Sequence, residues 1–432
     1  MKKLRLLTLI VLLLGMGLTA CAEPVSDGAL PPAQIPQIDV QNAGDMDEQT
    51  AEPEPEPTPD TRPERTPAPT PPPVPTPEVI MPFNMEIDAF TLARNMGAGW
   101  NLGNTLDARL APSALPLISA QEIAWGNPLT TREMINLVAD TGFSSLRLPI
   151  TWDRFIGPAP DYIIDDAILD RVQTLVDYGI EAGLYVIINT HHESWNFPSA
   201  ENREAALIHA AIWRQIGGRF AGYSERLIFE SMNEPRMFDT PHEWTGGTAE
   251  ARNVINGWNH IFIQTIRDTG YNNEHRFLMI PTIAASGDAV AVDDMWIPSD
   301  ERVLISIHSY TPFDLVLNTR SARRTFDPNL PSDTEDIDAL FERLYNRFIS
   351  QGTAVVMGEM GAINKDENIA YRAAWAEYYT AVAASLGIPC FWWDNGIRVY
   401  YRTGAEAFGL MNRRDLTWDY PEIVEAMLVN FR

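Results

Sequence analysis

Short runs of apolar residues alternate with longer amphipathic segments along most of this chain. Eight of the runs have the length and the branched or aromatic content of a buried β-strand. They lie at residues 97–101, 145–149, 184–189, 227–232, 277–281, 303–307, 354–358 and 389–393. The pattern predicts a strand at each of these places.

Between the runs, apolar residues recur every three or four positions, which is the spacing of one helix face. The clearest examples are Ile168, Val172, Leu175, Val176 and Ile180; Ile337, Leu340, Phe341, Leu344 and Phe348; and Trp375, Tyr378, Tyr379, Val382 and Leu386. A further helix is predicted from Thr131 to Asp140, with a threonine as its N-cap. Eight alternations of strand and helix favour a parallel sheet with crossover helices.

Eight such repeats can close on themselves, so we predict an α/β fold of the (β/α)8 TIM barrel type. The barrel would form one domain over residues 81–432. The alternative is an open, doubly wound sheet, which would have a glycine-rich phosphate turn after its first strand. Gly97, Gly99 and Trp100 lie within the first predicted strand and do not fit that motif.

The first 21 residues have the pattern of a targeting segment. Lys2, Lys3 and Arg5 precede the apolar run 6–20, which is too short for a comfortable membrane span. The run ends in small residues before Cys21, which resembles the bacterial lipoprotein box. On that resemblance Cys21 carries lipid, and the protein is an exported cell-surface lipoprotein of a bacterium with no spanning helix. An ordinary signal peptide cleaved nearby, giving a secreted protein, is the alternative.

Residues 22–80 are predicted to be a disordered, acidic and proline-rich linker, because such a composition cannot bury enough apolar surface to offset its ordering entropy. It holds twelve acidic and two basic residues, so it contributes −10 of the formal net charge of −26. The moderate negative charge of the rest argues against nucleic acid as a partner and suits a neutral substrate. After Cys21 the only cysteine is Cys390, which we expect to be a buried apolar residue.

Polar and aromatic residues follow nearly all of the predicted strands, at the end where barrels of this kind hold their sites. Glu234 follows the fourth strand and Glu359 the seventh. Two glutamates on two strand ends are what acid/base chemistry at a glycosidic bond requires. Taken alone, each glutamate could equally be a solvated residue at a strand end with no catalytic role.

Each of the other candidate site residues also has a purely structural explanation. Arg147 is either a structural ion-pair partner or a site residue, and an isolated His191 or His308 is more often a core histidine. His191 and His192 are adjacent, and neighbours on a strand point to opposite faces, so we predict no metal and no cofactor.

Twelve tryptophans are more than packing requires, and several lie beside polar strand ends. Flat rings at such places suit stacking on the apolar faces of pyranose units. Trp195, Trp296 and Trp393 are therefore predicted to bind substrate, together with Asn101 and His192.

These motifs, taken in order, resemble glycoside hydrolase family 5, and within it the endoglucanase and xyloglucanase subfamily 4. The resemblance covers the whole globular part. Its markers are Gly99 to Asp107, Ala124 to Pro128, Leu146 to Pro149, His191 to Glu193, Asn233 to Pro235, His308 to Tyr310, Gly358-Glu359 and Trp392 to Gly396.

The resemblance implies a retaining (β/α)8 hydrolase with Glu234 as acid/base and Glu359 as nucleophile. It also implies that Arg147, His191, Asn233, His308, Tyr310 and Trp393 belong to the site. We expect Arg147 and Tyr310 to lower the pKa of Glu359, and the charge of Glu359 to raise the pKa of Glu234. Trp393 would form the floor of the −1 subsite.

The implied substrate is a β-1,4-glucan backbone: a cellulose derivative, mixed-linkage β-glucan, or xyloglucan, with xylan and mannan as open alternatives. We expect a monomer. A surface glycan-binding lipoprotein without activity is one rival interpretation, and a barrel isomerase or aldolase acting on sugar phosphates is another. A binder does not need the two carboxylates, and an exported protein rarely meets phosphorylated sugars.

Overall fold

The computed structural model describes residues 77, 79–366, 368–399 and 406–432. The predicted signal segment with Cys21, and the predicted linker except for Pro77, Val79 and Ile80, lie outside these residues. Eight parallel strands form a closed barrel in chain order, so the predicted (β/α)8 fold is confirmed. The strands are β1 (Ala98–Leu102), β2 (Ser145–Leu148), β3 (Tyr185–Asn189), β4 (Leu227–Glu230), β5 (Leu278–Ser286), β6 (Val303–His308), β7 (Val355–Met360) and β8 (Cys390–Asp394).

All eight predicted strands are present, and β5 extends furthest beyond its predicted apolar run. β5 continues to Ser286, and its pairing with β6 is irregular after Pro281. Ala284 and Ala285 have positive φ angles of 53° and 47°, a conformation that a side chain with a Cβ seldom adopts. This irregular stretch could not be foreseen, because nothing in the sequence of β5 marks a bulge.

The predicted helices are also present. They are α3 (Arg132–Thr141), α4 (Asp166–Glu181), α9 (Pro331–Arg347) and α10 (Ile369–Ser385). The Thr131 side chain caps α3 by accepting a hydrogen bond from the backbone N–H of Met134 at 3.3 Å. Two more long helices, α5 (Arg203–Arg219) and α6 (Ala249–Arg267), also belong to the outer layer of helices. A further helix, α11 (Pro421–Leu428), lies near the C-terminus.

Shorter elements lie in the loops. They are α2 (Ile118–Ile123), α7 (Ala289–Asp293), α8 (Phe313–Val316) and the hairpin β9 (Met411–Asn412) and β10 (Thr417–Trp418). Among the described residues, no helix is both long and apolar enough to span a membrane.

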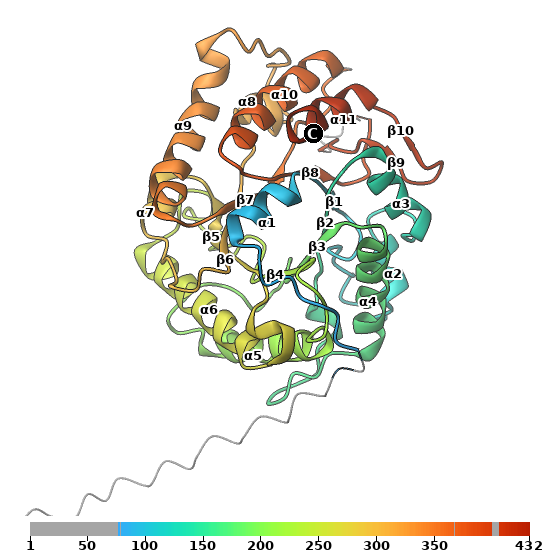
Figure 1. Ribbon diagram of the computed structural model, residues 1–432, viewed down its shortest axis with the longest axis vertical. Helices are drawn as coiled ribbons and strands as arrows, with labels where there is room; N and C mark the ends of the chain where they lie inside the picture. The colour runs from blue at the N-terminus through green and yellow to red at the C-terminus, as the bar shows by residue number, and fades with distance from the viewer. Residues whose placement is uncertain (1–76, 78, 367, 400–405) are drawn as a thin grey trace, which may run out of the picture. The chain divides into compact units, whose positions relative to one another are not determined.

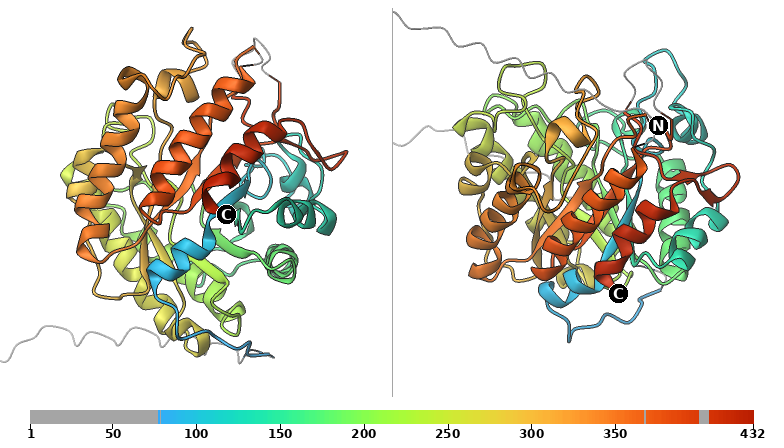
Figure 2. Two further views of the ribbon diagram at one scale, coloured as in Figure 1. Left: turned by 45° about the horizontal axis from the view of Figure 1, so that its top comes forward. Right: turned by 90° about the horizontal axis from the view of Figure 1, so that it is seen from above.

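One further helix, α1 (Ala89–Met96), closes the barrel at the amino ends of the strands. Its buried residues Leu92 and Met96 pack against inward-facing strand residues such as Ile228 and Phe391. Figure 1 shows α1 across the centre of the strand ring, with the other long helices around it. In the right-hand view of Figure 2, α1 lies at one end of the barrel and the long loops at the other. The floor is therefore filled with apolar side chains, and the other end is left for polar ones.

Candidate active site

The two glutamates predicted from the strand ends lie together at the carboxyl end of the barrel. Glu234 follows β4, and Glu359 lies within β7. One carboxylate oxygen of each, and a ring nitrogen of His308, all lie within 4.8 Å of one another. This proximity resembles the spacing of about 5–5.5 Å in retaining glycosidases rather than the 6.5–9.5 Å of inverting ones.

Glu359 receives two direct hydrogen bonds from side chains. Arg147 Nη1 donates to Oε1 at 2.8 Å, and the Tyr310 hydroxyl donates to Oε2 at 3.0 Å. Both of its oxygens are therefore held, which fixes the direction of the carboxylate. The two donors are those predicted for it.

Arg147 connects the residues of the site, although its side chain has no solvent exposure. Besides Glu359, its guanidinium donates to Asn101 Oδ1 at 3.0 Å and to Asn233 Oδ1 at 2.8 Å. A planar guanidinium with five donors in a fixed fork can hold several acceptors at set angles, which a lysine cannot do. Because Asn233 accepts through its oxygen, its NH₂ group is left to donate to a ligand.

Glu230, the last residue of β4, is a site-supporting residue that the sequence reasoning missed. It is fully buried and accepts from Arg147 Nε at 2.8 Å, Asn189 Nδ2 at 2.9 Å and Ser306 Oγ at 2.6 Å. Burial opposes its charge, but Arg147 and the other donors outweigh burial and lower the pKa of Glu230 to about 2. Strand alternation could have found it, because it points inward with Ile228 two residues earlier.

His308, at the end of β6, lies between three carboxylates. Its Nδ1 is 2.9 Å from Glu234 Oε1 and 3.8 Å from Glu359 Oε1. Burial lowers its pKa, but the charge of Glu359 and the contacts with Glu230 and Glu234 raise the pKa of His308 to about 9. The imidazolium therefore donates to Glu234 at neutral pH.

The pKa directions of the two glutamates differ from the expectation. Burial raises the pKa of Glu359, and Arg147 and His308 only partly oppose it. The pKa of Glu234 is lowered, because hydrogen bonding and charge from His308 outweigh the effect of burial. The expectation from the sequence included the effect of Arg147 on the pKa of Glu359, but it could not include the burial of Glu359. It also did not foresee that His308 contacts Glu234. The proton that we expected on Glu234 is therefore bound to His308 Nδ1, which donates a hydrogen bond to Glu234 Oε1 at 2.9 Å.

His191 forms one wall of the site with Trp393. The two rings stack with centroids 5.8 Å apart and an interplanar angle of 3°. Asn189 donates through Nδ2 to His191 Nδ1 at 3.2 Å, while its oxygen accepts from the Ile150 N–H. This fixes His191 as the tautomer with a proton on Nε2, consistent with a pKa that burial lowers well below its usual value.

Three of the residues predicted to bind substrate have partners within the protein. Asn101 is fully buried and holds Arg147, so it supports the site without reaching a ligand. Trp296 packs its ring against His260 of α6, with centroids 5.3 Å apart, and its backbone N–H donates to Asn256 Oδ1 of the same helix. It therefore belongs to the outer layer. Trp195 is half-buried, with its ring against His209 of α5 and its Nε1 on Glu193.

His192 does lie beside the site, in contact with His191 at a ring-centroid distance of 4.4 Å. Nitrogens of both histidines and an oxygen of Asp107 lie within 4.8 Å of one another. The argument that adjacent histidines must diverge is therefore wrong here, because both follow the end of β3 and are no longer in strand geometry. His191 Nδ1 is already an acceptor for Asn189, and Asp107 accepts from the N–H groups of Thr105 and Asn104, so the donor set is largely committed to the protein.

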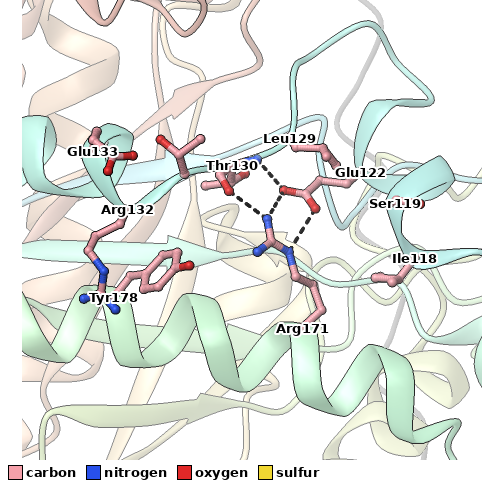
Figure 3. A pocket seen from close by; sticks show the side chains of 10 residues that line it. Ile118, Ser119, Glu122, Leu129, Thr130, Arg132, Glu133, Arg171 and Tyr178 are labelled. Atoms are coloured by element: carbon pink, nitrogen blue, oxygen red, sulfur yellow. Dashed lines mark hydrogen bonds and ion pairs between the residues drawn. The ribbon is translucent and has the colours of Figure 1, made fainter.

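A separate pocket of about 510 Å³ lies between α2, the start of α3 and α4. Its charged groups pair with one another, as Figure 3 shows: Arg171 donates to both oxygens of Glu122 and to the carbonyl of Thr130. The Arg132 guanidinium lies over the Tyr178 ring, 4.2 Å from its centroid. These contacts fasten the loop after β1 to α4, and they explain the pocket as a structural junction.

A carboxylate pair at the ends of strands four and seven of a (β/α)8 barrel, flanked by an arginine, histidines and a stacked tryptophan, defines the protein as a glycoside hydrolase. Residues 106–398 match the family model of cellulases, glycosyl hydrolase family 5, and the chain belongs to this family. The predicted family is thereby confirmed.

Two curated relatives and one solved structure illustrate the likeness. The chain is 45% identical over 356 residues to the cellulase/esterase CelE of Acetivibrio thermocellus, covering 81% of this chain and 41% of that protein, which is therefore much longer. It is 42% identical over 348 residues to endoglucanase A of Ruminococcus albus, covering 80% of this chain and 93% of that one. A broad-specificity endoglucanase of subfamily GH5-4 from Ruminococcus champanellensis, solved with bound cellotriose, is 43% identical with a TM-score of 0.75, covering 79% and 98%. The predicted endoglucanase activity agrees with all three.

Proposed function

We propose that this protein is a retaining endo-β-1,4-glucanase in which Glu359 is the nucleophile and Glu234 the acid/base. The observation that supports the proposal most directly is the approach of their carboxylates to within 4.8 Å across the mouth of the barrel. Such a spacing lets two carboxylates act on one anomeric carbon without a water between them.

In the first step, Glu359 attacks the anomeric carbon and the glycosidic bond breaks. Glu234 gives a proton to the leaving oxygen, which departs as a free hydroxyl group. His308 supplies this proton to Glu234 along their 2.9 Å hydrogen bond. As Glu359 loses its charge to the covalent bond, the attraction that holds the proton on His308 weakens, and transfer through Glu234 becomes easier.

In the second step, Glu234 takes a proton from water as the water attacks the glycosyl-enzyme, and it returns this proton to His308 along their hydrogen bond, which restores the starting state. The bond to Glu359 breaks, and the product keeps the β configuration. Asn233 is oriented by Arg147 so that its NH₂ group donates to the sugar 2-hydroxyl, an interaction that strengthens in the transition state. Trp393, held against His191, provides a flat face for the sugar bound before the scissile bond.

The test of these roles uses Glu359→Gln and Glu234→Ala. We expect Glu359→Gln to lose at least 10⁴-fold in kcat, as nucleophile removal costs in other covalent mechanisms, while its Kd for cellohexaose stays within about three-fold. Glu234→Ala, given an activated aryl cellotrioside and azide, should yield a glycosyl azide of β configuration.

Glu425→Gln, an exposed change in α11, serves as the matched control with unchanged kcat. Measurable turnover of unactivated glucan by pure Glu359→Gln would contradict its role as nucleophile.

The substrate range is proposed on the same basis. The R. champanellensis relative is a broad-specificity endoglucanase, and we propose the same breadth here: carboxymethylcellulose, mixed-linkage β-glucan and xyloglucan. Initial rates of reducing-sugar release across these three, with xylan and mannan beside them, test it. Higher kcat/KM on xylan or mannan than on every glucan would overturn it.

We further propose that the protein is an exported monomer anchored by lipid on Cys21. The support is the basic, apolar and small-residue pattern of residues 1–21. Metabolic labelling with a tagged fatty acid should mark the wild type and leave Cys21→Ser unlabelled. Light scattering of the soluble domain should give the mass of one chain.

A further inference from the structure

Glu234 has a second cation beside it, which the mechanism above does not use. His308 contacts Glu234 Oε1, whereas Arg236 Nη1 lies 3.4 Å from Oε2 and donates to the backbone carbonyl of Glu234 at 3.1 Å. Arg236 follows Glu234 by two residues in the loop after β4, and its side chain turns back toward the acid/base. Each carboxylate oxygen of Glu234 therefore has one cationic partner.

Arg236 is held in place by its own neighbours in this loop. Its Nε donates to Glu243 Oε1 at 3.0 Å, and its guanidinium lies over the rings of Phe238 and Trp244, 4.3 Å from each centroid. Glu243 Oε2 also accepts from the backbone N–H of Asp239 at 3.1 Å. A planar guanidinium suits this place, because it can stack on aromatic faces while its edge donates hydrogen bonds.

The backbone on either side of Glu234 is fixed as well. The N–H of Asn233 donates to the carbonyl of Thr190 at 2.8 Å, and the carbonyl of Pro235 accepts from the N–H of Ala284 at 2.8 Å. Ala284 belongs to the irregular stretch of β5, so that stretch supports the acid/base segment. With the backbone held at both neighbours, the contacts at the two oxygens determine the direction of the carboxylate.

The charge of Arg236 acts on Glu234 in the same direction as that of His308. Burial raises the pKa of Glu234, whereas His308 and, after it, Arg236 and His192 lower this pKa. Glu243 pairs with Arg236 and offsets part of its charge. The remaining titratable groups that interact with Glu234 lie on three other strands or their loops: Glu359 of β7, Tyr310 after β6 and Glu406 after β8.

We propose that Arg236 is a positioning residue for acid/base catalysis, which holds Glu234 at its second oxygen and by its charge favours proton release to the leaving oxygen. The proposal rests on the role of Glu234 proposed above. When Glu234 has given up its proton it is a carboxylate, and a cation fixed beside Oε2 stabilises the charge that develops there. The loss of Arg236 should therefore matter most where the leaving oxygen needs a proton.

The first test compares two substrates that differ in their need for a proton. Phenyl β-cellotrioside has a poor leaving group, whereas 2,4-dinitrophenyl β-cellotrioside releases a stable phenolate. We expect Arg236→Met to lose at least about ten-fold in kcat/KM on the phenyl glycoside and less than about three-fold on the dinitrophenyl glycoside, because general-acid catalysis contributes about 10²–10⁴-fold. Arg236→Lys keeps the positive charge and should lose less on the phenyl glycoside than Arg236→Met.

The second test is the pH profile of kcat/KM, whose basic limb reports the proton shared by Glu234 and His308. Arg236→Met should move this limb up by about 0.5–1 pH unit, since a nearby, partly paired cation opposes proton binding. Glu243→Gln leaves Arg236 without its counter-charge, so the limb should move to lower pH. The acid limb, which Glu359 sets, should move less in both variants, because Arg236 is not among the main groups that shift the pKa of Glu359.

Arg219→Met is the matched control, because Arg219 of α5 pairs with Asp170 of α4 in the outer layer. Its rate constants and both limbs should equal those of wild type. An equal loss on both glycosides in Arg236→Met, or an unmoved basic limb, overturns the proposal and leaves the proposed function intact.

Glu243→Gln keeps the test sharp if Arg236→Met does not fold, and a basic limb that stays or rises in Glu243→Gln also overturns the proposal. A wild type that hydrolyses neither glycoside would instead contradict the proposed function itself.

Discussion

At the scale of single residues, the site depends on buried charges that hold one another. Arg147 and Glu230 have no exposed side-chain surface, and they form an ion pair with a 2.7 Å contact between Arg147 Nη2 and Glu230 Oε2. A buried pair is worth little compared with an apolar pair, but breaking it by removing one partner is costly. Their value to the protein is the fixed direction of Arg147 toward Glu359 and Asn233.

The low pKa of Glu230 predicts a loss of stability in acid. A folded-state pKa of about 2, against an ordinary value of 4.5, stabilises the folded state above pH 4.5 by an amount on the order of 3 kcal/mol. This contribution is lost as the pH falls from 4.5 toward 2.

Glu230→Gln should therefore unfold at lower denaturant concentration at pH 7 and should show a flatter stability profile between pH 4.5 and pH 2. Urea unfolding at a series of pH values measures both. The same acid slope in variant and wild type would contradict the assignment. Asp333→Asn, at a partly exposed ion pair with Arg323, is the control with a small effect.

The pH dependence of activity should have two limbs with different origins. Glu359 must be ionised to attack, and its pKa is raised above the ordinary 4.5, so kcat/KM should fall as the pH drops through that raised value. His308 must carry its proton to supply Glu234, and its pKa is about 9, so activity should fall as the pH rises through about 9.

Rate profiles of wild type and His308→Asn, from pH 4 to pH 10.5, test this. The basic limb should be absent or shifted in the variant, while its overall rate falls at least about 100-fold, as expected for a lost proton-transfer group. A basic limb unchanged in the variant would assign it to another residue.

The residues that sequence reasoning brought to the right face of the barrel lie at or just after the carboxyl ends of strands, because the strand direction alone brings them together. Arg147, Asn233, His308, Tyr310 and Glu359 are in this group. It failed for Trp296, since the path of the loop after α7 is set by packing against α6 and no local signal records it. It also missed the contact of His308 with Glu234, which requires knowledge of neighbouring strands rather than of either motif.

At the scale of elements, the barrel depends on close contacts between neighbouring strands. Gly99 of β1 lies directly beside the ring of Phe391 of β8, and a Cβ added at Gly99 would be 2.2 Å from Phe391 Cδ1. Such an overlap must displace the ring from the packed barrel interior. The fixed spacing of strands in a closed barrel leaves little room for this displacement.

Gly99→Ala should therefore destabilise the protein by roughly 1–3 kcal/mol, the usual cost of overpacking. Gly257→Ala is the matched control: Gly257 is exposed in α6, and its added Cβ would meet nothing within 4 Å. That change should stabilise by about 0.5–1 kcal/mol, because alanine favours a helix interior. Denaturant midpoints of the two variants should move in opposite directions, and a midpoint for Gly99→Ala equal to wild type would refute the packing argument.

The elements themselves were largely predictable, since buried parallel strands are continuous apolar runs and the outer helices have one apolar face. The pattern of apolar residues did not predict the extension of β5 to Ser286, where two alanines adopt positive φ angles. The short helix α1 was also missed, because only eight residues form it and its role appears only when the barrel it closes is known.

At the scale of the whole molecule, the described chain divides into a barrel and the segment that closes it. Met81 donates its N–H to the carbonyl of Gly222 at 2.7 Å, and Arg302 donates to the carbonyl of Met85 at 3.1 Å. Both partners lie just before strands, at the amino end of the barrel. The segment 79–97 is thus an integral part of the domain.

Two truncations should therefore behave differently. Removal of residues 1–76 should leave kcat/KM on soluble β-glucan and the Tm unchanged. Removal of residues 1–97 also removes α1, with Leu92 and Met96 fully buried, and each of these side chains contributes about 1.5–3 kcal/mol by burial. The longer truncation should be insoluble or should melt at least 10 °C lower. Equal melting temperatures for the two would show that α1 is dispensable.

The attachment of this segment at the floor of the barrel has a practical consequence. Any support joined ahead of Pro77, whether a resin bead or a fused scaffold, meets the domain on the side where α1 sits and not on the side of Glu234 and Glu359. A long glucan could then lie across the open end of an immobilised enzyme without passing the linkage. Coupling through the opposite rim, for instance near Trp244, would obstruct that passage.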